Sequence, residues 1–165
     1  MNYKRAMIGG AVGALAVTFY NLILRWLGMQ IDIEMILGTL FGGLPGPGMW
    51  WIGFGIHVVM GSVFGVIYAF FFELGTRRTG WAAGIKVAVL HTIAAGFLYG
   101  FFPVISPVIP YYLPAPGYFM AHNGFPYIIA FVGMYMLFGI IMGLTYKING
   151  KIQLLPIEQL TMNNE

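Results

Sequence analysis

Residues 49–72 read MWWIGFGIHVVMGSVFGVIYAFFF, and this stretch decides the fold class. It contains no Asp, Glu, Lys or Arg. At about 1.5 Å per residue, an α-helix needs about 20 apolar residues to cross a hydrocarbon core roughly 30 Å thick. The stretch therefore predicts a membrane-spanning helix. A four-residue repeat runs through it: Gly53, His57, Gly61 and Gly65. One helix face is therefore nearly smooth and carries a single imidazole.

The composition of the 165-residue chain supports this class. Hydrophobic residues make up 59% and charged residues 8%, against roughly 25% charged residues in soluble domains. A soluble fold of this size would not bury so much apolar surface, so we expect lipid to be its solvent. The formal charge is +3, but the basic residues are scattered and flank apolar runs, which indicates membrane orientation rather than nucleic-acid binding. The chain has no Cys, so disulfides and thiolate chemistry are excluded.

Apolar runs on both sides of this stretch complete the predicted fold. The N-terminal run has the layout of a signal peptide but is longer than the usual apolar region of one, so we expect an uncleaved anchor. We predict an all-α transmembrane domain over residues 1–150 and a cytoplasmic tail over 151–165. Its four transmembrane helices are predicted at about residues 6–26, 49–72, 81–102 and 127–146.

Two irregular segments connect these helices. Residues 28–48 begin with apolar and acidic residues and end in Gly and Pro, which predicts a short external helix lying at the membrane interface and then a break. Its buried stripe is expected to be Ile31, Met35, Ile36 and Leu40. Residues 101–125 are rich in Pro and aromatic residues and contain no charged residue, which predicts an interfacial loop.

The basic residues predict the orientation. If the N-terminus is cytoplasmic, all eight basic residues except Arg25 lie on the cytoplasmic side, as the positive-inside rule favours. We therefore expect a multi-pass protein of the cell inner membrane with both termini in the cytoplasm.

Small residues spaced by four occur in all four predicted helices. Between lipid-solvated helices, association depends on close backbone approach, which small residues allow. We therefore expect a tightly packed, Gly-striped bundle with some steep crossings. The expected packing residues are Gly9, Gly13, Gly61, Gly65, Gly96, Gly100, Gly139 and Gly143.

The pattern resembles a family of uncharacterised four-helix bacterial inner-membrane proteins, known as a domain of unknown function. The matching features are the Gly-rich first helix, the stretch DIEMILG at 32–38, Gly53-x-x-x-His57-x-x-x-Gly61 and the final Gly139-x-x-x-Gly143. That family commonly places a second His near the last of these motifs. This chain has Tyr135 there, so the resemblance does not carry a paired-histidine role to it. It implies a fold and a location, and no activity.

Two histidines within the predicted spans are candidate site residues. His57 is expected roughly 10 Å from the external end of its helix, and His91 near the middle of the next. Ionisable residues at such depth are functional candidates, because burying them is costly. Facing histidines would be able to ligate haem between helices, although His91 is expected roughly 6 Å deeper. Neutral histidines bonded to Tyr or Thr of a neighbouring helix are the simpler interpretation. We expect no bound cofactor, with haem as the alternative.

A metal site on the outer face is a weaker hypothesis. Asp32, Glu34 and His122, with Met35 or Met120, have suitable ligand types. Asp32 and Glu34 are two residues apart, however, and would point away from each other on a helix. Loop carboxylates exposed to water explain them better, so we expect no metal site.

The chain contains none of the common catalytic motifs, so we expect a non-enzymatic protein. The predicted function is an accessory or scaffold subunit of a larger inner-membrane assembly, or a homo-oligomer. Its partners would be lipid and other integral membrane subunits or copies of itself, and no nucleic acid. The uncharged loop favours this role, because an exposed apolar surface is usually covered. The expected partner-contact residues are Pro110, Tyr111, Tyr112, Tyr118 and Phe119.

Two alternatives belong to other classes of protein. One is a membrane redox protein that binds haem or another cofactor through His57 and His91. The other is a small-solute carrier or channel. No carboxylate lies within a predicted span, which argues against proton or ion transport.

Overall fold

The computed structural model describes residues 1–148, and this part of the chain is helical, without strands. Four helices are long and apolar enough to cross a membrane, which confirms the predicted class of multi-pass membrane protein. The predicted tail at 151–165 lies outside the described residues. The four are α1 (Tyr3–Trp26), α3 (Pro47–Phe70, continued by the π-helical η1, Phe71–Thr76), α4 (Trp81–Gly100) and α6 (Phe125–Thr145).

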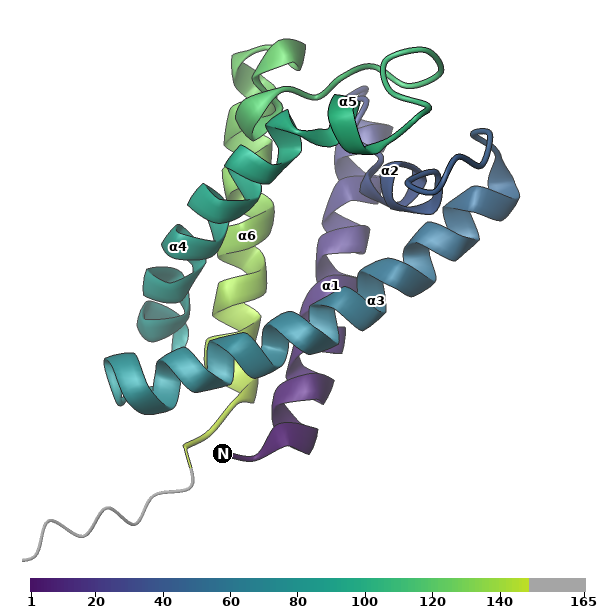
Figure 1. The fold of residues 1–165 in the computed structure, drawn as a ribbon. Coiled ribbons are helices and arrows are strands. Elements are labelled where there is room, and N and C mark those ends of the chain that lie inside the picture. The colour runs from purple at the N-terminus through teal and green to yellow at the C-terminus, as the bar shows by residue number, and fades with distance from the viewer. Residues whose placement is uncertain (149–165) are drawn as a thin grey trace, which may run out of the picture.

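Three of these helices run roughly along one another, and α3 crosses two of them. Figure 1 shows α3 passing obliquely across α1 and α6. Helix α1 packs on both α3 and α6, and α6 packs on α4, whereas α3 meets α6 only weakly. The molecule is therefore two closely packed helix pairs, α1 with α3 and α4 with α6, joined mainly through α1 and α6.

Each pair has a point where the two backbones touch. A Cβ atom at Gly10 of α1 would overlap the carbonyl oxygen of Gly61 in α3, and one at Gly65 would overlap that of Ala6. In the second pair, a Cβ at Gly84 of α4 would overlap the carbonyl oxygen of Gly139 in α6. Contacts this close require glycine and bring the backbones together without help from hydrophobicity.

The other glycines expected at helix contacts have different neighbours. Gly9 and Gly13 of α1 face side chains of α6. Gly96 and Gly100 of α4 lie under the rings of Phe119 and Tyr118, and so contact the cap described next rather than another long helix.

A cap covers one end of α4 and α6. It consists of α5 (Phe102–Ile105), irregular turns and the 3₁₀ segment η2 (Tyr118–Asn123), and η2 packs on both long helices. Its buried side chains are Phe102, Val108, Ile109 and Met120. Tyr111 and Tyr112 point away and are 84% and 64% exposed.

The short helix α2 (Ile33–Gly38) is packed against α3. It begins at Asp32, whose carboxylate accepts a hydrogen bond from the backbone N–H of Met35 at 2.9 Å, as helix N-caps do. Two glycines let it lie directly on α3: a Cβ at Gly53 would overlap the carbonyl oxygen of Glu34, and one at Gly38 that of Met49. The predicted short helix is therefore present, and it is held inside the protein.

Candidate ligand-binding site

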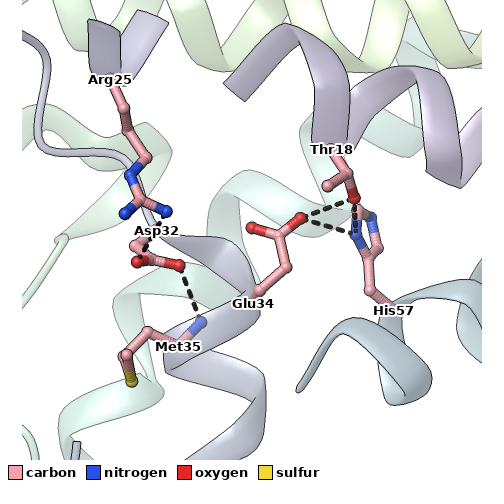
Figure 2. A network of polar contacts seen from close by, with 6 residues as sticks. All are labelled: Thr18, Arg25, Asp32, Glu34, Met35 and His57. Carbon is pink, nitrogen blue, oxygen red and sulfur yellow. Dashed lines mark hydrogen bonds and ion pairs between the residues drawn. The ribbon is translucent and has the colours of Figure 1, made fainter. Parts of the chain in front are cut away.

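The contact between α2 and α3 buries a carboxylate. Glu34 is only 1% exposed, and its Oε1 accepts a hydrogen bond from the hydroxyl of Thr18 on α1 at 2.6 Å. The Nδ1 atom of His57 on α3 lies 3.2 Å from the same oxygen and 3.1 Å from the Thr18 hydroxyl (Figure 2). Three elements thus meet in one polar cluster, which we call the Thr18–Glu34–His57 cluster.

The donors in this cluster fix the state of the imidazole. An ionised carboxylate only accepts hydrogen bonds, and the single hydroxyl proton of Thr18 is already given to Glu34. The hydrogen bond between His57 and Glu34 must therefore be donated by Nδ1, so Nδ1 is the ring nitrogen that carries the proton. In a neutral imidazole this leaves Nε2 with a free lone pair, on the opposite edge of the ring.

Two opposing effects determine the charge of Glu34. Burial raises the pKa of its carboxyl group. The hydrogen bonds from His57 and Thr18, together with a backbone hydrogen bond and the electrostatic effect of His57, lower the pKa by more in total. The net result is a pKa below the ordinary value of 4.5, so Glu34 is a carboxylate at neutral pH.

Asp32 has a different role. Its carboxylate lies 3.0 Å from the guanidinium of Arg25 at the end of α1, and both side chains are partly exposed (Figure 2). This ion pair and the N-cap bond hold the start of α2 beside α1, although an ion pair so exposed adds little stability. Asp32 and Glu34 do point apart, as their spacing predicts.

The expectation that both carboxylates are exposed to water is wrong for Glu34. The reason is tertiary: Gly38 and Gly53 allow α2 to lie on α3, and this position turns Glu34 inward. A close α2–α3 contact was not deduced from the sequence, although Gly53 lies one helical turn before His57. Thr18 was not singled out at all.

A cavity of about 220 Å³ adjoins the cluster, and all six α-helices contribute to its walls. His57 and His91 both line it, together with Tyr99 and Tyr135, and its other walls are apolar. The lining contains no Asp, Glu, Lys or Arg side chain. The structure therefore brings the two predicted histidines to one space.

His91 is surrounded by aromatic rings. The ring of Phe64 stacks on it with centroids 4.3 Å apart, and Tyr135 meets it edge to face at 4.6 Å. Its Nδ1 lies 3.3 Å from the hydroxyl of Tyr68. The hydrogen bonds expected of neutral histidines, one to a Thr and one to a Tyr of neighbouring helices, are thus both present.

Haem does not fit this arrangement. The cavity is smaller than the roughly 300–1,000 Å³ of drug-sized ligand pockets. The rings of Phe64, Tyr135 and Phe138 lie 4.3 to 5.8 Å from the His91 ring and occupy the space a macrocycle would need. The walls suit a smaller molecule.

The hypothesis of an outer-face metal site finds no support among residues 1–148, where no three His, Asp or Glu side chains gather closely enough to hold an ion. Asn21, on α1 one turn beyond Thr18, is 1% exposed, and its amide has no hydrogen-bond partner in the described part of the chain. Arg25, one turn further along α1, pairs with Asp32.

The four apolar helices define the class of the protein, an integral membrane protein. No protein-family model, curated protein or solved structure matches the chain. The resemblance to the uncharacterised four-helix family stays a prediction.

Proposed function

We propose that this integral membrane protein binds a small apolar molecule with one polar group in the cavity between its helices. The observation that carries the proposal is the position of His57, held by Thr18 and Glu34, in the wall of a mainly apolar cavity. Ligand sites typically combine apolar walls with a few converging polar groups. A buried carboxylate and histidine between membrane helices are costly, and such groups usually mark functional sites.

The rim of the cavity indicates where the ligand enters. Met60 of α3, Leu98 of α4 and Ile105 of α5 line the cavity and are also exposed. These side chains are apolar, and two of them belong to candidate membrane-spanning helices. The cavity therefore opens sideways between α3 and α4, and we propose that the ligand arrives from the lipid.

Filling the cavity should abolish binding. Ala95 of α4 lines the cavity and is 8% exposed, so Ala95→Phe places a ring inside it. We expect the affinity for 2-methoxynaphthalene, an apolar probe without a hydrogen-bond donor, to fall at least about tenfold. The new ring would occupy the space in which the probe buries its apolar surface. The measurement is probe fluorescence in detergent-held protein against a micelle-only blank.

The neighbouring residue gives the matched control. Ala94 is exposed and does not line the cavity, so Ala94→Phe should leave probe affinity unchanged. Equal probe binding by the wild type and both variants would show that the probe sits elsewhere, and the proposed function would be wrong.

A second candidate function rests on the cap. We propose that the protein also acts as a non-enzymatic accessory subunit of an inner-membrane assembly, or as a homo-oligomer, with both termini in the cytoplasm. The supporting observation is the exposure of Pro110, Tyr111 and Tyr112 at the tip of an uncharged segment. Tyr118 and Phe119 pack on α4 through Gly100 and Gly96, so the proposed contact surface narrows to residues 110–112.

Changing this tip should separate the partners. In Tyr111→Ser/Tyr112→Ser, we expect the native mass of gently extracted protein to fall to that of a single chain, because the variant removes the aromatic contact area. Tyr3→Ser, which also removes an exposed tyrosine, is the control and should keep the wild-type mass. A variant that keeps the wild-type native mass and the same co-purifying chains would contradict the accessory role of this surface.

A further inference from the structure

We infer that the ligand of the cavity carries an uncharged aromatic hydroxyl, as in a phenol or quinol, and donates it to Nε2 of His57. The inference rests on the proposed function and names the ligand class of that same site. Three features of the structure lead to it: the tautomer of His57, the charge balance of the cluster and the aromatic walls.

Because Nδ1 of His57 carries the proton, its Nε2 is able only to accept, so the ligand must be a hydrogen-bond donor. Nδ1 of His57 is engaged with Glu34 and Thr18 at 3.2 and 3.1 Å. Nε2 makes no hydrogen bond to any residue in 1–148, and His57 lines the cavity. Nε2 of His57 is thus a free acceptor at the cavity, and a hydroxyl is the simplest neutral group to fill it.

The negative charge of Glu34 argues against a ligand with an anionic head group. The cluster already contains the Glu34 carboxylate, and no Lys or Arg lines the cavity. A fatty acid or phosphate group would place a second negative charge beside the first in an apolar space, and one imidazole would not compensate both. A hydroxyl adds no charge and leaves the Glu34–His57 pair intact.

The aromatic walls of the cavity favour a ligand with a planar ring. Three aromatic rings that line the cavity contact the His91 ring at centroid distances of 4.3 to 5.8 Å. Phe64 stacks on it, and Tyr135 and Phe138 meet it edge to face. Aromatic pairs contribute beyond the area they bury, so a planar ring gains more in this space than a flexible chain. A cavity of about 220 Å³ holds one or two fused rings rather than a large macrocycle.

The test compares two probes of the same ring system, of which only one has a hydrogen-bond donor. 2-Naphthol has the hydroxyl, and 2-methoxynaphthalene replaces that hydrogen with a methyl group. Wild-type protein should prefer naphthol by about tenfold, the effect of one hydrogen bond to a buried polar group. In Glu34→Gln/His57→Leu, which removes the acceptor without leaving an unpaired carboxylate, the preference should fall to about one. The affinity for the ether should stay within about twofold of wild type in this variant, because the apolar walls are intact.

The wild-type protein keeps the test valid if the double variant does not fold. Equal affinity of the wild type for naphthol and for its ether would overturn the inference and leave the proposed function standing. A tenfold preference that persists in the double variant would do the same, because the acceptor is then not Nε2 of His57. Failure of the ether to bind wild-type protein would overturn the proposed function itself.

Discussion

Replacing His57 with alanine should lower the free energy of unfolding by about 3 kcal/mol, because the buried Glu34 carboxylate loses one of its two side-chain hydrogen-bond donors. Glu34 is 1% exposed and would keep its charge with only the Thr18 hydroxyl to compensate it. The measurement is reversible unfolding in mixed micelles as the fraction of a denaturing detergent is increased, followed by circular dichroism.

Two controls separate this effect from lost packing. Glu34→Gln/His57→Leu leaves no buried charge and should recover most of the lost stability. Lowering the pH should also remove the difference in stability, because it protonates Glu34. Because the pKa of Glu34 in the folded protein lies below 4.5, the wild-type contribution is present above that pH and is lost as the pH falls through the folded pKa. The gap between wild type and His57→Ala should therefore narrow below about pH 4.5. An unchanged gap, or a double variant as unstable as the single one, would mean that Glu34 is not charged in the folded protein.

Replacing Gly84 with leucine should destabilise the protein by about 3 kcal/mol or more, at or above the upper end of the range for overpacked cores. Even a Cβ at Gly84 would overlap the backbone of Gly139, so α4 and α6 would have to separate along their contact. The same unfolding measurement tests it. Gly55→Leu is the control, because a Cβ at Gly55 of α3 meets nothing within 4 Å. An equal loss of stability in both variants would indicate a general effect of leucine in these helices, and not a specific effect on the α4–α6 contact.

The helices were predictable because each is a long run of apolar residues, a signal carried by the local sequence. The four predicted spans begin and end within a few residues of α1, α3, α4 and α6. His57 and His91 were also predictable as candidates, since ionisable residues are rare in such runs. Their common cavity was not predictable, because it depends on the oblique path of α3, which comes from backbone contacts at Gly61 and Gly65 with α1.

Glu34 shows the limit of local reasoning most clearly. In the sequence it lies in a short segment between two helices, where a carboxylate is normally solvated. Its burial depends on α2 lying on α3 at Gly53, nineteen positions further along the chain (53 − 34). No carboxylate lies within the four ranges predicted as spans, but Glu34, a carboxylate from outside them, reaches His57 within one.

The sideways opening between α3 and α4 has a consequence for how binding would be regulated. A site that fills from the bilayer responds to the mole fraction of its ligand in the lipid, and not to the concentration in water. A molecule scarce in the cytoplasm but strongly partitioned into the membrane would saturate the site. Occupancy would then change with lipid composition or with the ratio of lipid to protein, even when the total amount of ligand in the cell stays constant.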